Sequence, residues 1–329
     1  MAGRDRFATI DALRGLAAIS VTLFHVGPTS ALPMPGGYLA VDLFFALSGF
    51  VIAHSYTPRF KDGMGLRDFL QRRVIRLYPM LFVGALLGIV LHGGAASMIF
   101  LVPEFRSSQL YPTNPPFWSL LMELMVNVAF ALVVLRLTRG WMALAMAVSA
   151  AVLAAGLASG QPLFEVGVNW SSFHLALART VFSFTAGVAI HALWQRHGCP
   201  SRTTRLALLP LLAATLVFAL VPQNSNLAGM TAVLLFVPLA TWLAVCWELP
   251  WRGPAQALGD LSYPLYCIHV PIIALARDEG WITMGLCLAV VAAAWALDRY
   301  VDRPARRLVG WAMAQNARMR LAPGRTLNS

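Results

Sequence analysis

Ten apolar stretches of about 20 residues recur along the chain, and this repetition constrains the fold more than any other feature. They cover residues 10–27, 38–56, 72–92, 117–137, 141–158, 173–194, 205–221, 228–247, 258–276 and 281–299. As a helix, each stretch can cross the ~30 Å hydrocarbon core of a bilayer. Hydrophobic residues make up 58% of the chain and charged residues only 12%, which is too apolar for a soluble domain. Because such long runs do not suit barrel strands, we predict an all-α, polytopic membrane helical bundle of about ten transmembrane helices.

The distribution of positive charge predicts the orientation of this bundle. The net charge is +11, and with both termini on one side 21 of the 25 basic residues fall in segments on that side. The opposite segments hold only Arg106 and Arg277. The positive-inside rule therefore places both termini in the cytoplasm. The same asymmetry accounts for the basic charge, so the predicted partner is the lipid bilayer and no nucleic acid is expected.

The domain organisation predicted from the sequence is simple. Residues 1–308 form one transmembrane domain, and residues 309–329 form a basic cytoplasmic tail. No spacing of cysteine and histidine residues suggests a metal site.

The first apolar stretch carries Arg14 and His25, two side chains that are costly in hydrocarbon and that often mark function there. Eleven residues of helix are three turns plus about 20°, so the two share one face and lie ~16 Å apart along the axis. Arg14 is expected near the cytoplasmic surface and His25 in the outer half of the bilayer. The structural alternatives are a surface anchor paired with Asp11 for Arg14, and an interhelical hydrogen bond for His25.

Asp42, Glu123 and His269 lie in three further apolar stretches, at a predicted depth similar to that of His25. Four ionisable side chains from four helices at one level indicate a functional site in the outer half of the membrane. Arg179 lies inside a span and needs a partner in the bundle.

Two neutral side chains accompany these groups. Ser119 lies on the helical stripe of Glu123, and Tyr266 lies on the arc of His269. Tyr266 and His269 are candidates for the acceptor side of a substrate site, and Ser119 is a further substrate-binding candidate. Packing and interhelical hydrogen bonding are the alternatives for Tyr266 and His269.

A second cluster, at the predicted cytoplasmic surface, contains Arg73 and Arg76. Residues three apart on a helix are neighbours, so both side chains can face one ligand. Together with Arg14 they could form a phosphate-binding fork, because guanidinium groups bind phosphate bidentately. The alternative is the ordinary excess of positive charge on inner loops, which explains Arg72 well.

The sequence resembles the acyltransferase 3 family of integral membrane acyltransferases. The matching motifs follow one another between residues 10 and 308: IDALRGLAAISVTLFHV, VDLFFALSGFVI, RRVIRLYP, NPPFWSLLMEL, LSYPLYCIHVPI and VDRPARRL. Arg14 and His25 match the family's Arg-x10-His pair, Arg73 and Arg76 match its Arg-x-x-Arg pair, and Glu123 ends its Trp-Ser-Leu-x-x-Glu motif. Six motifs in the family's order make this resemblance specific.

The resemblance implies a function. Family members transfer an acyl group, most often acetyl from acetyl-CoA, to hydroxyl groups of sugars outside the cytoplasm. It implies that His25 is the catalytic residue and that Arg14, Arg73 and Arg76 contact acyl-CoA. The acceptor would be a carbohydrate or lipid-linked glycan, such as a surface polysaccharide or lipopolysaccharide. The predicted location is the bacterial plasma (inner) membrane, and acyl-CoA would be a donor substrate with no permanently bound cofactor.

The chain departs from the family pattern at two positions. Leu124 stands where a second acidic residue is common, and Asp302-Arg303-Pro304 stands where Glu-x-Pro is common. Many relatives also carry a fused SGNH hydrolase-like domain that accepts the acyl group. This chain ends at Ser329, so we expect it to act alone or with a separate extracytoplasmic acyl-carrying partner.

These residues suggest a mechanism. The phosphates of acyl-CoA would bind the three arginines, and the ~16 Å stripe would bring the thioester to His25. This imidazole could act as a general base or be acylated itself, with Glu123 or Asp42 as its orienting carboxylate. The rival hypothesis is a proton-coupled membrane transporter or a glycoconjugate export protein, because both also use intramembrane ionisable residues. Acyl transfer by the purified protein would discriminate between the two.

Overall fold

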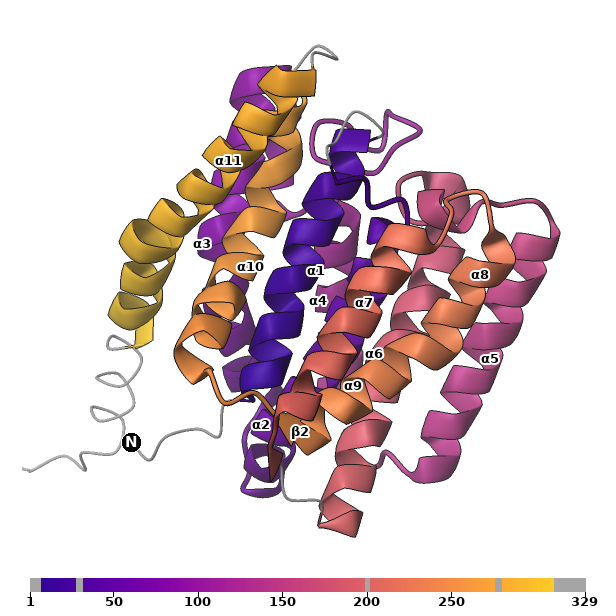
Figure 1. The fold of residues 1–329 in the computed structure, drawn as a ribbon. Helices are drawn as coiled ribbons and strands as arrows, with labels where there is room; N and C mark the ends of the chain where they lie inside the picture. Colours follow the sequence, from indigo (N-terminus) through magenta and orange to yellow (C-terminus); the bar gives the residue numbers. More distant parts are fainter. Residues whose placement is uncertain (1–6, 28–31, 199–201, 276–279, 311–329) are drawn as a thin grey trace, which may run out of the picture.

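The computed structural model describes residues 7–27, 32–198, 202–275 and 280–310, and it shows a bundle of helices that run alternately up and down (Figure 1). The α-helices are α1 (Ala8–Val26), α2 (Ala40–Lys61), α3 (Leu66–His92), α4 (Phe117–Val133), α5 (Arg139–Ala158), α6 (Phe173–His197), α7 (Leu208–Leu220), α8 (Asn226–Thr231), α9 (Val237–Cys246), α10 (Arg252–Ile273) and α11 (Gly280–Leu297).

Short elements connect or extend these helices. The 3-10 turns are η2 (Gly37–Leu39), η3 (Ala96–Phe100), η4 (Leu163–Glu165), η5 (Trp170–Ser172) and η6 (Arg205–Ala207). Two turns are π-helical, η7 (Ala232–Phe236) between α8 and α9 and η8 (Asp298–Asp302) after α11. The strands β1 (Arg202–Thr203) and β2 (Trp247–Glu248) form one short parallel pair.

The prediction of an all-α bundle is confirmed, because each of the ten apolar stretches overlaps a helix. Within the described residues, six helical segments are long and apolar enough to cross a membrane: Ala8–Val26, Gly37–Lys61, Leu66–His92, Arg139–Ala158, Trp170–His197 and Asn226–Cys246. The apolar helices Phe117–Val133 and Arg205–Leu220 are shorter. The number of about ten spans and the cytoplasmic termini stay predictions, and most of the predicted tail, residues 311–329, lies outside the described residues.

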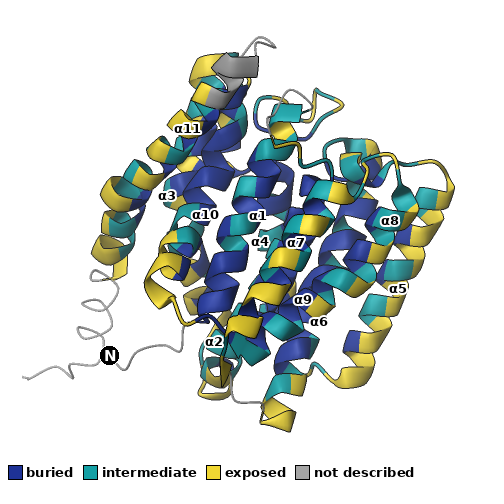
Figure 2. Cartoon of the chain, in the orientation of Figure 1, coloured by how far each residue is buried: buried dark blue, intermediate teal, exposed yellow. Residues whose placement is uncertain are grey.

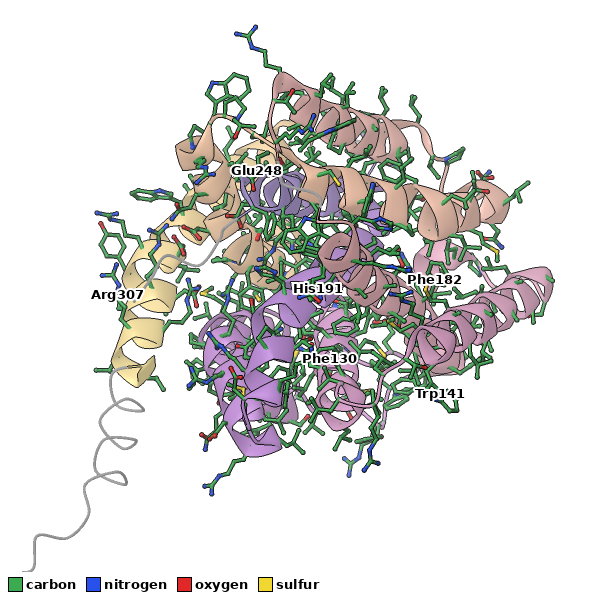
Figure 3. The ribbon with its side chains drawn as sticks, turned by 90° about the horizontal axis from the view of Figure 1, so that it is seen from below. Phe130, Trp141, Phe182, His191, Glu248 and Arg307 are labelled. Carbon is green, nitrogen blue, oxygen red and sulfur yellow. The ribbon has the colours of Figure 1, made fainter. Side chains whose placement is uncertain are left out.

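Burial separates a central group of helices from an apolar exterior. In Figure 2, α1 and α10 are mostly buried, whereas the outer faces of α5 and α11 are exposed. Viewed from below, His191 and Phe182 lie within the bundle and Trp141 lies at its rim (Figure 3). Many large apolar side chains are exposed on the periphery, and a continuous apolar surface of this kind fits contact with lipid.

Two small residues allow α1 and α10 to cross closely. A Cβ atom on Gly15 would lie 2.5 Å from the Cβ of Leu258, and a Cβ on Gly259 would lie 2.7 Å from the Cβ of Asp11. Small residues let helix backbones approach in this way in membrane proteins. This crossing brings α1, with Arg14 and His25, against α10, with Tyr266 and His269.

Substitution of Gly15 by alanine should destabilise the protein by roughly 1–3 kcal/mol, because the added methyl group overlaps Leu258 and pushes α10 away. The midpoint of thermal unfolding in detergent measures this effect. Gly285→Ala is the matched control, since a Cβ on Gly285 in α11 meets no described atom within 4 Å. The control should be neutral, or more stable by up to about 1 kcal/mol through helix propensity. Equal midpoints for the two variants would contradict the close crossing.

The first turn of α1 is fixed to the strand β2. The Ala8 amide donates to Oε2 of Glu248 at 3.0 Å, and the Thr9 hydroxyl donates to the Trp247 carbonyl at 2.6 Å. Burial raises the pKa of Glu248, and its bond with the Ala8 amide opposes this shift. A carboxylate at a helix N-terminus also suits the helix dipole. These contacts set the start of the helix that carries Arg14.

Candidate functional site

A cavity of about 450 Å³ lies between α1, α2, α3, α4, α10 and the helical residues that follow η8. Its wall carries five arginines and one acidic residue, which gives it a strong positive charge: Arg14, Arg72, Arg73, Arg76, Arg306 and Glu123. The three arginines predicted to bind the donor therefore line one cavity. Among the described residues, Arg14 has no ion-pair partner, whereas Arg73 and Arg76 each have one.

The pair formed by Arg73 and Glu123 lies on the cavity wall. Nη2 of Arg73 lies 2.7 Å from Oε1 of Glu123, and the Ser48 hydroxyl donates to the same oxygen at 2.9 Å. The sequence placed Glu123 at the level of His25 and Arg73 at the inner surface. Their direct contact corrects that placement. Because the arginine side chain is long, it reaches a carboxylate well inside the bundle.

Ser119 and Tyr266 form another part of the cavity wall. Their hydroxyl oxygens lie 2.6 Å apart, and each lies within hydrogen-bonding distance of the Pro116 carbonyl oxygen, at 2.9 and 3.2 Å respectively. Both side chains are buried, so this arrangement satisfies two polar groups that would otherwise be costly inside a bundle. The structure thus brings together two predicted substrate-binding residues.

His25 contacts His269, not a carboxylate. Nδ1 of His25 lies 3.2 Å from Nε2 of His269 and 2.8 Å from the carbonyl oxygen of Val21. Glu123 bonds Arg73 and Ser48 instead, and no bond joins His25 to Glu123 or Asp42 among the described residues. The prediction that one of these carboxylates orients His25 therefore has no support in the geometry.

The bonding partners determine which ring nitrogens carry protons. Nδ1 of His269 faces the carbonyl oxygens of Leu265 and Tyr266, at 3.2 and 2.8 Å, and a carbonyl only accepts. This nitrogen therefore carries the proton, and Nε2 of the neutral, fully buried His269 is an acceptor. Nδ1 of His25 must then be the donor. The lone pair on Nε2 of His25 is left for chemistry, and His25 itself is exposed.

Tyr266 connects the cavity with the histidine pair. Its hydroxyl group lines the cavity, its ring centre lies 5.7 Å from that of His269, and the His269 ring centre lies 5.0 Å from that of His25. Neither histidine is part of the cavity lining. The sequence predicted that the thioester would arrive near His25, whereas in the structure the cavity lining approaches His25 only through Tyr266 and His269.

Asp42 binds Arg179 in the interior of the bundle. Nε of Arg179 lies 2.8 and 2.9 Å from the two carboxylate oxygens of Asp42, and Nη2 donates to the carbonyl oxygen of Tyr38 at 2.9 Å. Both side chains are almost fully buried. Arg179 thus has the partner that the sequence required. The structure does not bring Asp42 to His25. The contacts of Asp42 with Arg179 are those of a counter-ion.

Sequence reasoning did not assign Ser48 or Arg306 to this site. Ser48 lies in the quoted motif VDLFFALSGFVI, and its small polar side chain in an apolar span was an available signal. Arg306 lies in VDRPARRL and counted only as inner-surface charge. Its place on the cavity wall follows from the packing of the terminal helix, which one span alone does not reveal.

Comparison with known proteins identifies the family. A family model described as an acyltransferase domain, acyltransferase 3, matches residues 7–298. The chain belongs to the acyltransferase 3 family. The resemblance inferred from the motifs is confirmed, and this acyltransferase 3 protein is an integral membrane O-acyltransferase.

Three curated proteins illustrate the range of its relatives. The peptidoglycan O-acetyltransferase OatA of Listeria monocytogenes is 24% identical over 92% of this chain and 56% of its own length. The acyltransferase MdmB of Streptomyces mycarofaciens is 25% identical over 93% of each chain. The exopolysaccharide production protein ExoZ of Rhizobium meliloti is 26% identical over 80% of this chain and 85% of its own. This acyltransferase 3 chain spans little more than half the length of OatA. No solved structure matches it.

Proposed function

We propose that this protein transfers an acyl group, acetyl in the first instance, from cytoplasmic acyl-CoA to a hydroxyl group of an extracytoplasmic sugar. The observation that carries this proposal is the arginine-lined cavity, whose Ser119–Tyr266 wall lies beside the His25–His269 pair. A positive cavity connected through Tyr266 and His269 to an imidazole with a free nitrogen suits a donor and an acceptor that approach from opposite sides of a membrane.

The charge of the cavity supports a polyanionic donor. The diphosphate and 3′-phosphate of coenzyme A are strong acceptors for planar guanidinium groups. Arg14 offers all its donors, because it has no ion-pair partner among the described residues. With the arginine-rich end in the cytoplasm, these phosphates would bind near the inner surface. The pantetheine arm would then extend along the cavity toward Ser119 and Tyr266.

His25 would act as the catalytic base. Its Nε2 lone pair accepts the proton of the acceptor hydroxyl while the hydroxyl oxygen attacks the thioester carbonyl carbon. The carbon–sulfur bond then breaks, and the coenzyme leaves as a thiolate that takes up a proton. Nδ1–H of His25 is shared between the Val21 carbonyl oxygen at 2.8 Å and Nε2 of His269 at 3.2 Å, and these two acceptors hold its ring, the role that a carboxylate plays in a triad. Acylation of His25 followed by transfer uses the same geometry.

The acceptor is proposed from the relatives. OatA is named for peptidoglycan O-acetylation and ExoZ for exopolysaccharide production, so a surface polysaccharide or a lipid-linked glycan is the acceptor class to test first. The bacterial inner membrane is the proposed location, since it separates cytoplasmic acyl-CoA from such glycans. A separate extracytoplasmic acyl-carrying protein is a further partner to look for in the same experiment.

Inside-out membrane vesicles test this function directly. Supplied with acetyl-CoA labelled in its acetyl group, vesicles with the wild type should transfer label to a glycan, lipid or protein fraction. Arg14→Gln should reduce this transfer about tenfold at limiting donor, because a charge-assisted contact to phosphate is lost. Arg139→Gln, an exposed arginine at the start of α5, is the control and should match the wild type.

Two outcomes would contradict the proposal. One is the absence of label from all three fractions in wild-type vesicles. The other is the accumulation of a labelled solute inside vesicles with no transfer of its acetyl group, which is the result expected of a transporter.

A further inference from the structure

The cavity wall includes a cation from the far end of the chain. Arg306 lies in the helical segment 303–310 that follows η8, and its side chain lines the cavity together with Arg76 of α3. The two residues are 230 positions apart in sequence. Their side chains are partly exposed, with relative accessibilities of 26% and 29%, so their charged ends can reach a ligand.

One buried carboxylate holds both arginines. Nη2 of Arg306 lies 2.6 Å from Oδ2 of Asp302, and Nη1 of Arg76 lies 3.6 Å from the same oxygen. The Asp302 side chain is only 1% exposed and is not part of the cavity lining. It therefore lies behind two arginines that face the cavity. Nη2 of Arg306 also lies 3.6 Å from Oδ1 of Asp298, a second buried carboxylate outside the cavity lining. The positive charge of the ligand space comes from the lining itself, which holds five arginines and one glutamate.

Two guanidinium nitrogens in this region make no hydrogen bond to the described residues. Nη1 of Arg76 and Nε of Arg73 are buried and have no hydrogen-bond partner among the described residues. The Arg76 guanidinium also lies 5.5 Å from the Tyr263 ring centre, a cation–π contact that fixes it further. Nη1 of Arg76 is the atom that faces Asp302, so a ligand in the cavity would contact the exposed part of the Arg76 side chain.

We infer that Arg306 and Arg76, positioned by Asp302, form a phosphate subsite for the nucleotide part of the acyl-CoA donor. This inference rests on the proposed function and goes beyond it in naming the residues that recognise the 3′-phosphoadenosine diphosphate, as distinct from the pantetheine arm. Arg306 is a binding residue in this subsite. Asp302 is a positioning residue, because it contacts the arginines and not the cavity.

Binding of coenzyme A to the purified full-length protein tests the subsite without knowledge of the acceptor. Isothermal titration in detergent should show that Arg306→Gln weakens coenzyme A binding about tenfold, the loss of one charge-assisted hydrogen bond. For pantetheine, which lacks both the diphosphate and the nucleotide, the dissociation constants of the variant and the wild type should be nearly equal. Arg307→Gln is the matched control, since Arg307 is exposed, is absent from this cavity and lies on the outer side of the terminal helix (Figure 3).

The affinity of Asp302→Asn for coenzyme A is a second measurement. The two possible roles of Asp302, as a nearby charge or as a positioning residue, predict opposite changes in this affinity. Removal of a negative charge near a phosphate should strengthen binding if Asp302 acts through its charge alone. If it positions the two arginines, binding of coenzyme A should weaken although the site becomes more positive. The midpoint of thermal unfolding, measured for every variant, shows whether each one is folded.

Three results would overturn the inference. Arg306→Gln could bind coenzyme A as tightly as the wild type does, or it could lose the same factor in its affinity for pantetheine, which would indicate a general distortion. Either result leaves the proposed donor in place, because the wild type still binds it. Failure of the wild type to bind coenzyme A would instead overturn the proposed donor, and this subsite with it.

Discussion

Replacement of His25 by alanine should lower acyl transfer by about 10²- to 10⁴-fold, the usual contribution of a general base, and should leave the protein folded. The side chain is exposed, and its partner His269 keeps its own contacts to two backbone carbonyls, so no buried charge is stranded. Label transferred per mole of purified protein measures the loss. His174→Ala, which removes an exposed histidine on α6, should retain full activity.

Two further measurements separate chemistry from structure at His25. Added imidazole should partly restore the activity of His25→Ala, because the position is open to small molecules and imidazole can accept the same proton. His269→Ala should lose less activity than His25→Ala, and the double variant should be no worse than His25→Ala alone, as expected of residues that act as a unit. Wild-type activity in His25→Ala would exclude His25 as the base.

Loss of either member of the Asp42–Arg179 pair should destabilise the bundle by roughly 3–5 kcal/mol, because one charge is then left buried without a counter-ion. The relevant variants are Asp42→Asn and Arg179→Gln, and thermal unfolding in detergent or the yield of folded protein measures the effect. Joint replacement by Asp42→Leu and Arg179→Met should recover most of the loss. The recovery will be incomplete, since the carbonyl oxygens of Leu163 and Tyr38 lose their arginine donors.

The activity of the joint variant decides between two roles for Asp42. If Asp42 is a counter-ion, the folded double variant should transfer acyl groups at a rate close to that of the wild type. If Asp42→Asn stays fully stable and yet loses activity, the sequence-based assignment of Asp42 to the chemistry would be correct after all.

The helices of this protein were predictable because lipid imposes a length and a composition on each of them. All ten apolar stretches overlap helices, and the eleven-residue spacing of Arg14 and His25 placed both residues on one face of α1. These are properties of a single helix, and the sequence states them directly. The same reasoning predicted approximately how deep each polar residue lies in the membrane, but not where it lies in the plane of the membrane.

The pairing of polar residues was not predictable, because depth does not tell which helices are neighbours. Asp42 and Arg179 were each recognised as intramembrane ionisable groups, yet nothing in the sequence joined α2 to α6. The contact between His25 and His269 likewise depends on the close crossing of α1 and α10. Arg73 and Glu123 were assigned to opposite ends of the bundle because the reach of a long side chain was not added to the depth of its helix.

The π-helical turn η8 makes the position of Arg306 depend on the number of residues in this part of the chain. Such a turn holds one residue more than an α-helical turn, so each residue after it is rotated relative to an uninterrupted α11. Removal of one residue from 298–302 would restore ordinary helical hydrogen bonding and rotate all that follows by about 100°. Arg306 would then leave the cavity wall although every side chain around it was unchanged. In this segment the number of residues matters as much as their identity, and an insertion or deletion could alter the site where a substitution would not.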